Sequence, residues 1–328
     1  MATGLVPLEK LQFGLETTPG TLVPATKVYI AEDGGEFTPE LERQAVEEVR
    51  GVLAVVEDFD VRAGSLLNVA GVLDFEQCLL AFETGLATVA PVGVGPYTRT
   101  YTPSLTAPNA VKAATFEVAY TDGTTKHVER EFGFGQCSKF NVELAFNAPA
   151  RFNAEFFARA DQASTLTPAL SPITREIARS NAFNVYIDPT WALLGTTEVT
   201  AGLVRSATLE VMTGIEQQYG IDSRTNLDFG TIQRGMITGS LAISMAVNSG
   251  FAAEFEAWRA GTVRFIRLKA AGSAGRLITF DMAGRYTSVK FGRDGNLRTA
   301  DLTFEFRYDP TSAKVFQAEV VNSLATFT

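Results

Sequence analysis

Two stretches decide the fold of this chain, because the second repeats the first: Gly64-Ser-Leu-Leu-Asn-Val69 with Phe75-Glu-Gln-Cys-Leu-Leu-Ala-Phe-Glu-Thr-Gly85, and Gly239-Ser-Leu-Ala-Ile-Ser244 with Phe251-Ala-Ala-Glu-Phe-Glu-Ala-Trp-Arg-Ala-Gly261. Each predicts a strand followed by a helix that ends at a glycine. The copies are 175 positions apart at the Gly-Ser-Leu and 176 apart across the helix. A duplicated chain of this kind is expected to be an assembly unit rather than an enzyme.

Length and composition predict two mainly β domains. The chain has 328 residues, which fits two domains of about 150 residues each better than one core. Hydrophobic residues make up 46%, and frequent Phe, Gly and Thr favour sheet over a helical bundle. We therefore expect a first domain at residues 1–162 and a second at 173–328, joined by the Ser-, Thr-, Ala- and Pro-rich linker Asp161–Pro172.

Charge is unevenly distributed along the chain. The formal net charge is −9, and the segment Glu32–Asp60 alone holds ten carboxylates against Arg43 and Arg50. Arginines are denser from Arg259 to Arg307. Opposite patches on one chain favour head-to-tail contact between copies, although a solvated sheet face would also explain the arginines. The residues expected at this contact are Glu40, Glu42, Glu47, Glu48, Arg264 and Arg267.

The sequence offers no set of residues for catalysis. The single histidine, His127, excludes a histidine triad or a histidine zinc cluster, and Gly133-Phe-Gly135 lacks the third glycine of a dinucleotide loop. Cys78 and Cys137 are expected to be ordinary reduced thiols. We therefore predict no catalytic residue, no cofactor and no metal ligand. No apolar run reaches about 18 residues and no signal peptide is recognisable, so synthesis in a cytoplasm is expected.

Several segments carry local signals. Phe13–Pro24 is turn-rich and predicts an extended arm, and Ala87–Val111, with four prolines, predicts a surface loop. Thr311–Thr328 is apolar enough to need a surface on which to dock. The signals from Thr38 to Val56 fit either a helix or a hairpin, and we favour the hairpin. Asp122-Gly123 predicts a hairpin turn.

Two strands alternate clearly between apolar and polar residues, Lys139–Phe146 and Thr299–Tyr308. One face of each must be core, and the other meets solvent or a cavity. The polar faces carry Glu143, Asp301 and Glu305. Shifting the second strand by one residue would bury charged side chains, so its orientation is well specified.

These features resemble the tail tube (major tail) proteins of long-tailed bacteriophages, of the duplicated-domain type. The resemblance rests on Gly14-Leu-Glu-Thr-Thr-Pro-Gly-Thr21, on Val23-Pro-Ala-Thr26, and on the two strands and glycine-closed helices quoted above. It implies two tandem β-sandwich or partial-barrel domains, each with one flanking α-helix. It also implies that copies assemble into stacked rings around a channel, a closed β-barrel, through which DNA passes. Rings of six tube domains would need three such chains with pseudo-sixfold symmetry, and a hexamer is the alternative.

The resemblance further implies contacts, partners and a location. Contacts between rings or subunits would include Phe13, Glu16, Thr21, Phe316 and Phe327, and the channel lining would include the three polar-face carboxylates unless these face external solvent. The partners would be copies of the chain, the tape measure, tail terminator and distal tail proteins, and DNA in non-specific transit, without any membrane. The location would be the virion tail, after synthesis in the bacterial host cytoplasm.

Three other interpretations remain open at this point. The chain could be another tail ring component, such as a terminator or a baseplate hub protein. A cytoplasmic β-rich carbohydrate-binding module would need exposed aromatic residues on a flat face, whereas Trp191 and Trp258 are isolated in the sequence. A glycosidase would need two inward carboxylates on separate strands.

Overall fold

The computed structural model describes residues 8–32, 35–46, 57–200, 203–221 and 227–327. The first half contains β1 (Lys10–Leu15), β2 (Lys27–Tyr29), β3 (Glu36–Val46), β4 (Glu57–Val72), α1 (Leu79–Gly85), β5 (Tyr97–Tyr101), β6 (Ala114–Thr121), β7 (Lys126–Ala145), β8 (Arg151–Ala158) and β9 (Gln162–Ala163). The second half contains β10 (Phe183–Asp188), β11 (Val204–Met212), β12 (Ile215–Gln218), β13 (Thr231–Arg234), β14 (Thr238–Ala246), α2 (Ser249–Ala260), β15 (Arg264–Ala271), β16 (Leu277–Asp294), β17 (Leu297–Phe306) and β18 (Phe316–Asn322). Short 3-10 turns lie at Ser180–Ala182, Trp191–Leu193 and Ser273–Gly275.

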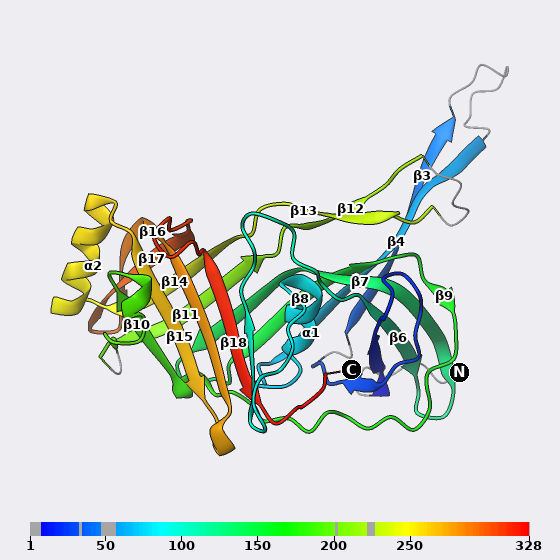
Figure 1. The fold of residues 1–328 in the computed structure, drawn as a ribbon, viewed down its shortest axis with the longest axis horizontal. Helices are drawn as coiled ribbons and strands as arrows, with labels where there is room; N and C mark the ends of the chain where they lie inside the picture. Colours follow the sequence, from blue (N-terminus) through cyan, green and yellow to red (C-terminus); the bar gives the residue numbers. More distant parts are fainter. Residues whose placement is uncertain (1–7, 33–34, 47–56, 201–202, 222–226, 328) are drawn as a thin grey trace.

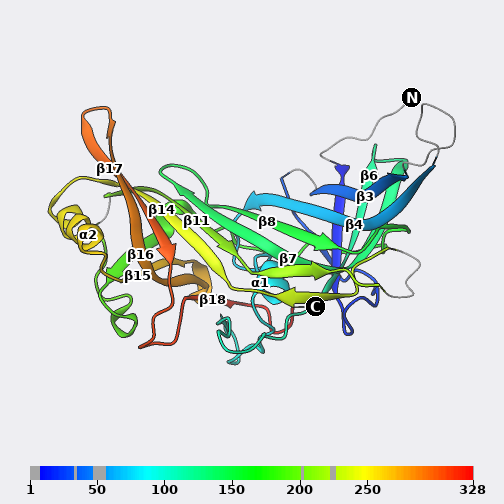
Figure 2. The same ribbon diagram turned by 90° about the horizontal axis from the view of Figure 1, so that it is seen from above.

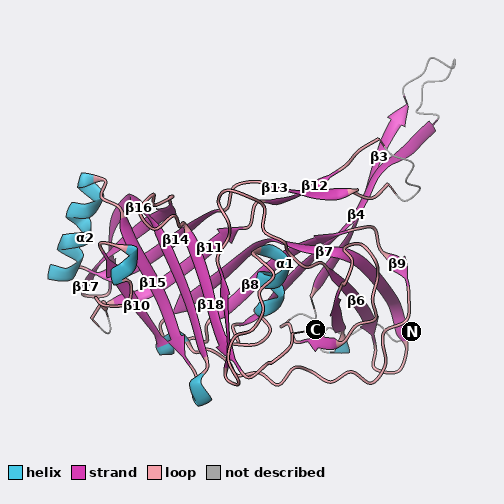
Figure 3. Cartoon of the chain, in the orientation of Figure 1, coloured by secondary structure: helices cyan, strands magenta, loops and turns pink. Residues whose placement is uncertain are grey.

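Strands dominate the molecule, which confirms the expected mainly β fold (Figure 3). The molecule is elongated, with α2 at one end and the hairpin of β3 and β4 projecting from the other (Figure 1). The described part of the segment from Thr38 is therefore strand, as favoured, and residues 47–56 lie outside the described residues. The described strands form a large antiparallel sheet but no closed barrel, so a barrel within one chain is excluded for them.

The same order of strand pairing occurs twice. In the first half it is β3-β4-β8-β7-β6-β1, and in the second half it is β11-β14-β17-β16-β15-β10. The long strands β7 and β16 occupy the same place in this order, and each carries a bulge where it changes partners, at Cys137/Lys139 and at Tyr286/Ser288. The two halves join where β7 pairs with β11, so that one sheet runs through the whole chain (Figure 2).

The pairing register differs by one residue from the repeat seen in the sequence. Leu67 pairs with Phe156, and Leu241 pairs with Phe304, so these two leucines are equivalent at a separation of 174. The Gly-Ser-Leu motifs in the sequence are separated by 175 residues instead. A slip of one residue moves every side chain to the opposite face of a strand. Burial of the leucines against the core therefore decides the register, and the short glycine motif does not.

One hydrophobic core extends through both halves. Phe82 of α1 is fully buried, and its ring lies 5.2 Å from Phe140, 6.1 Å from Phe152 and 6.1 Å from Phe280 of the second half. Such aromatic contacts add to the burial of apolar surface. The helix α2 is instead half-exposed at the end of the molecule, where its Phe251 packs on Phe291 of β16 with ring centroids 5.7 Å apart.

The helix α2 begins and ends as its sequence predicts. The side chain of Asn248 accepts a hydrogen bond of 2.9 Å from the backbone N–H of Phe251, which satisfies one of the first free donors of the helix. Gly261 ends the helix with φ +62°, a left-handed conformation that favours glycine. The glycine at the end of the repeated motif is therefore a helix terminator in this half.

Three segments expected outside the sheets are in fact paired within the chain. Part of the predicted arm belongs to β1, which pairs with β6 and β2. The predicted loop Ala87–Val111 contains β5, which pairs with β18 of the C-terminal segment, for example Tyr101 with Ala318. The C-terminal segment docks, as expected, but its surface is the outer edge of β16 in the same chain. Partners more than 200 positions away leave no local signal, which is why the sequence missed β5.

Candidate assembly edges and polar face

The sheet that joins the two halves ends in two unpaired edges. Its eight strands run in the order β3-β4-β8-β7-β11-β14-β17-β16. Among the described strands, β3 pairs only with β4, and β16 pairs only with β17 from Arg285 to Asp294. The two edges lie at opposite ends of the sheet. An edge strand presents a row of free N–H and C=O groups, which can pair with another strand.

The junction between the halves shows how such edges fit together. Residues Lys139–Ala145 of β7 pair with Ser206–Met212 of β11, with Val142 opposite Leu209. At the two ends of this ladder Phe146 N–H donates to Arg205 O at 3.1 Å, and Thr213 N–H donates to Ser138 O at 2.9 Å. By strand order β3 occupies the place of β11, and the end of β16 occupies the place of β7. Each free edge of the chain is thus the counterpart of one side of this junction.

Proline at position 39 fits the role of β3 as an edge. Pro39 lies opposite Ser65 of β4, in the place that Val211 holds in β11. The N–H of Val211 points toward β7, so the nitrogen of Pro39, which carries no hydrogen, points away from the sheet. Proline with its nitrogen on the open side is one of the means by which edge strands resist indiscriminate pairing.

One face of the eight-stranded sheet is mostly polar, although Leu66, Phe157 and Met212 also lie on it. Its carboxylates include Glu36, Glu40, Glu143, Glu155, Glu210, Asp301 and Glu305, and its cations include Lys139, Arg151, Arg285 and Lys290. Between them lie mostly small side chains, such as Ser206, Thr208, Ser240, Ala242, Ser244, Ser288 and Thr303. The opposite face is apolar and forms the core. Among these charged side chains carboxylates therefore outnumber cations.

The three predicted polar-face carboxylates lie on this common face. Glu143 is half-buried and accepts from the side-chain amides of Asn141 at 3.3 Å and Asn153 at 3.5 Å. Asp301 is exposed and accepts from Ser244 Oγ at 2.6 Å, and Glu305 is exposed. The structure thus brings onto one surface side chains that belong to both halves of the chain.

A cation that the sequence did not single out crosses this face at the junction. Lys139 Nζ lies 3.2 Å from Glu210 of β11 and 3.7 Å from Glu155 of β8. These hydrogen bonds and charges raise the pKa of Lys139, although its burial acts in the opposite direction. Lys139 therefore links three strands, two from the first half and one from the second. No local pattern marks it, because both of its partners are distant in sequence.

The arginines expected to receive a neighbour's acidic segment are engaged inside the chain. Arg264 Nε donates to Glu254 at 3.1 Å, and Arg267 donates two hydrogen bonds to the buried Asp281, at 2.6 and 2.8 Å. Of the acidic residues, Glu40 lies 3.5 Å from Arg62 and Glu42 is exposed. Glu47 and Glu48 lie outside the described residues. Arg264 and Arg267 thus each have a carboxylate partner within the chain.

The aromatic and arm residues expected at contacts are mostly interior. Phe13 is fully buried, and its ring lies 5.6 Å from that of Phe327, which is also buried. Phe316 is buried in β18. Glu16 is buried too and accepts from the N–H of Phe134 at 2.7 Å, while burial raises the pKa of its carboxyl group. Only Thr21, in an exposed bend, keeps a surface for a neighbour.

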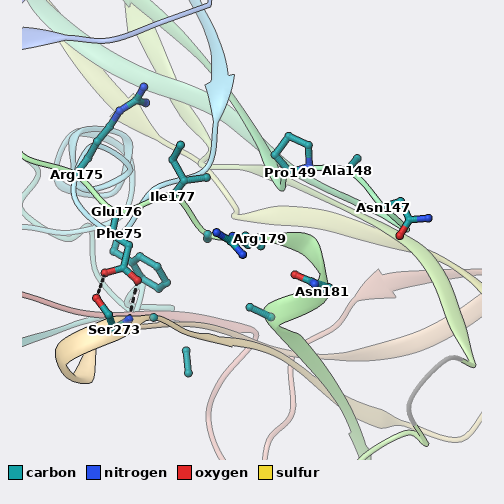
Figure 4. Close-up of a pocket in the computed structure, with 14 residues that line it drawn as sticks. Phe75, Asn147, Ala148, Pro149, Arg175, Glu176, Ile177, Arg179, Asn181 and Ser273 are labelled. Atoms are coloured by element: carbon teal, nitrogen blue, oxygen red, sulfur yellow. Dashed lines mark hydrogen bonds between the residues drawn. The ribbon is translucent and has the colours of Figure 1, made fainter.

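One cavity lies where residues 175–182, which lead into β10, run past the turns at 147–149 and 271–273 (Figure 4). Its volume is about 850 Å³, and Glu176 is the one carboxylate among its lining residues. Glu176 accepts hydrogen bonds from the N–H and the hydroxyl group of Ser273, so it is held in place by the second half. The paired carboxylates that a glycosidase would need are not in this cavity. Within the described residues no group of three potential metal ligands was found, and no helix is long and apolar enough to cross a membrane.

An antiparallel sheet with two complementary open edges, a polar face and a core-facing face defines a self-assembling structural subunit. The sequence model of the phage tail tube protein family matches residues 8–308, and the chain belongs to this family. It is therefore a structural protein of the tail tube, and its place is the virion tail. A search of the curated proteins found no match. Nothing in these comparisons favours a terminator, a hub protein or a carbohydrate-binding module.

Proposed function

We propose that three chains close a ring, in which the free end of β16 in each subunit pairs with β3 of the next. The observation that carries this proposal is the β7–β11 junction, which already joins equivalent strands inside the chain. We further propose that residues 1–162 and 173–328 are the two tube domains, so that the ring has pseudo-sixfold symmetry. Copying the internal junction to the ends of the sheet leaves no edge unpaired, which removes a template for aggregation.

The register of the proposed contact follows from the internal one. Phe37 takes the place of Leu209 and Phe291 takes the place of Val142, so these two residues would face each other across subunits. Thr38 would then lie opposite Lys290. Glu210 and Asn141, the pair equivalent to Thr38 and Lys290, exchange no backbone hydrogen bonds, because the bonded pairs alternate with it along the ladder. Pro39 would cost one hydrogen bond of the ladder.

The width of the sheet favours three subunits over six. Three chains supply 24 strands, which at a spacing of about 4.8 Å and a tilt of about 40° close a barrel about 50 Å across. Six chains would double that width to about 100 Å. The smaller barrel already leaves a channel wide enough for duplex DNA once side chains are added, and the larger one would need a much flatter curvature between strands.

The polar face would line the channel. Its carboxylates repel phosphate, and its small hydroxyl-bearing side chains offer few cations to hold DNA during passage. Glu143, Asp301 and Glu305 would then be lining residues. Rings would stack into the tube and meet the tape measure, tail terminator and distal tail proteins at its ends, without catalysis, after synthesis in the host cytoplasm. The family assignment and the polar sheet face support these points.

A pair of cysteines tests the ring. Thr38→Cys combined with Lys290→Cys places two thiols in a non-hydrogen-bonded pair, where β carbons approach most closely. Oxidised assemblies should give a covalent ladder on denaturing gels that stops at the trimer. Thr38→Cys with Arg285→Cys is the matched control, since position 285 lies on the same face but four pairs away along the ladder, or about 13 Å. Equal cross-linking of the control, or a ladder that ends at the hexamer, would refute the proposed register or stoichiometry.

A further inference from the structure

An excursion from the second half covers one end of the first half. After β11 the chain forms the hairpin of β12 and β13, which runs along the molecule toward β4 (Figure 1). Phe229, just before β13, is fully buried, with its ring 5.0 Å from Phe134 and 5.6 Å from Phe157 of the first half. A hydrophobic cluster of its own therefore fixes this excursion to the neighbouring half.

Groups at the end of β8 hold the same excursion. Arg159 Nε donates to Phe229 O at 3.3 Å, and the N–H of Ala160 donates to Asp228 Oδ1 at 2.7 Å. The N–H of Ala63 in β4 donates to Leu227 O at 3.1 Å. The ends of the adjacent strands β8 and β4 therefore hold the excursion in place. The contacts to β8 are made by the neighbouring residues Asp228 and Phe229.

The corresponding strand ends of the second half are open. Pairing order makes Arg307 the counterpart of Arg159, and Ile237 the counterpart of Ala63. The match extends to the backbone, because Arg159 N–H donates to Gly133 O on β7 and Arg307 N–H donates to Ala283 O on β16, both at 2.9 Å. A cavity of about 650 Å³ lies beside Arg307 and Ile237.

The lining of this cavity is apolar and basic. Met236 is 84% exposed and Tyr308 is 56% exposed, which leaves large apolar side chains in contact with solvent. Arg234 donates through Nη2 to Gly85 O and Leu86 O, whereas its buried Nη1 has no hydrogen-bond partner among the described residues. Arg307 is exposed and also lines the cavity. An occupant with an aromatic ring beside a carboxylate would fit both features.

The hairpin of β3 and β4 carries such a pair. Its position in the strand order equals that of the β12–β13 excursion, and it projects from the chain at the end where a neighbour would pair (Figure 1). Asp58-Phe59 repeats the dipeptide Asp228-Phe229, and Phe59 is 58% exposed. Asp58 is exposed beside it, on a hairpin rich in carboxylates. The chain therefore contains both an open cavity beside Arg307 and an exposed Asp-Phe dipeptide that could enter such a cavity.

We propose that Phe59 of one subunit fills the cavity beside Arg307 and Tyr308 of the next, with Asp58 accepting a hydrogen bond from the N–H of Tyr308. The inference rests on the proposed ring, since it needs β3 next to β16 of another copy. The reach has a precedent within the chain: the excursion between β11 and β14 brings Phe229 to Phe157 of β8, which lies three strand spacings from β14, or about 14 Å. The hairpin between β3 and β4 would likewise cross three spacings from β4 over β3 and β16 to β17. The acidic hairpin thus meets Arg234 and Arg307, rather than Arg264 and Arg267.

Cross-linking distinguishes this contact from ring closure. Phe59→Cys with Tyr308→Cys is compared with the Thr38→Cys and Lys290→Cys pair in the full chain, where both native cysteines are buried. The expected result is a disulfide ladder from both pairs that stops at the closed ring. If rings form the β3–β16 cross-link but not the 59–308 cross-link, the hairpin contact is refuted and the ring stands. If neither forms in assembled protein, the ring proposal and this inference both fail.

Two further outcomes are informative. A 59–308 ladder that continues beyond the closed ring would place the contact between stacked rings and would overturn the inference. Asp58→Arg should slow assembly at least tenfold in light scattering, and Arg307→Asp in the same chain should restore most of the rate, because the charges are exchanged. Val61→Ala, on the same hairpin but away from the dipeptide, is the matched control and should leave the rate unchanged.

Discussion

Replacing Arg276 by methionine removes the cation that neutralises a carboxylate buried in the core. Arg276 Nε lies 2.7 Å from Oε1 of the fully buried Glu76, and Arg276 Nη1 lies 3.3 Å from Glu176. Glu76 lies just before α1, Glu176 lies between the linker and β10, and Arg276 directly precedes β16. The group therefore ties the two halves of the chain together.

The loss of stability in Arg276→Met follows from the buried Glu76 carboxylate that remains without its cation. Breaking a buried ion pair by removing one partner costs about 3–5 kcal/mol, because the remaining charge is uncompensated. In a domain whose whole stability is about 5–15 kcal/mol this is a large fraction. Glu76→Gln should cost less, since Arg276 keeps some access to water and to Glu176. The double variant should be more stable than Arg276→Met alone, with a coupling free energy of at least about 1 kcal/mol.

The loss should depend on pH in a fixed direction. Burial raises the pKa of Glu76 despite Arg276, whose hydrogen bond and charge both lower it. Without the arginine the pKa rises further. A carboxyl group whose folded pKa lies above its unfolded value stabilises the fold below the unfolded pKa, and that contribution is lost as pH rises through the folded pKa. The deficit of Arg276→Met should therefore be largest near pH 7 and shrink toward pH 4.5.

Urea unfolding of the unassembled protein is followed by circular dichroism at pH 7, 6 and 5. At each pH it gives the difference in the free energy of unfolding between the original chain and Arg276→Met. The Glu76→Gln and double variants are measured in parallel as controls. A loss below 1 kcal/mol at pH 7, or a loss that does not shrink on acidification, would refute the reasoning.

Three further outcomes are expected. Phe82→Ala should lower the free energy of unfolding by about 3–5 kcal/mol in urea titration, and Phe82→Leu by less than half of that, since Phe82 is fully buried among rings of both halves. In Phe229→Ala, limited proteolysis should cleave the β12–β13 hairpin at least tenfold faster than in Phe229→Leu, because Phe229 is fully buried. Equal cleavage rates in the two variants would contradict the anchoring role of Phe229. Glu143→Lys with Glu305→Lys should give tubes that retain fluorescent DNA at low salt and release it at high salt, whereas tubes that bind no DNA would place these residues outside the channel.

Much of the local structure could be predicted from sequence. The hairpin at Asp122-Gly123 forms as its turn signal indicates, with Asp122 Oδ1 accepting from the N–H groups of Thr124 and Thr125. Along the alternation from Thr299 to Tyr308, Ala300, Leu302 and Phe304 are buried as predicted, whereas Thr299 of the polar face is also buried and Tyr308 is 56% exposed. By contrast, the alternation from Lys139 to Phe146 predicts Phe146 on the core face together with Phe140, whereas Phe146 lies just past the end of β7 and is 65% exposed.

The sequence by itself determined the strand periods, the glycine-terminated helix of the second half and the polar faces of single strands, because these depend on residues a few positions apart. Only the tertiary structure decided that β7 pairs with β11, that β5 pairs with β18, and that the arginines at 264 and 267 are neutralised within the chain. The physical reason is that pairing between distant strands depends on complementary edges and on burial of one face. Neither leaves a pattern within the span of a single strand.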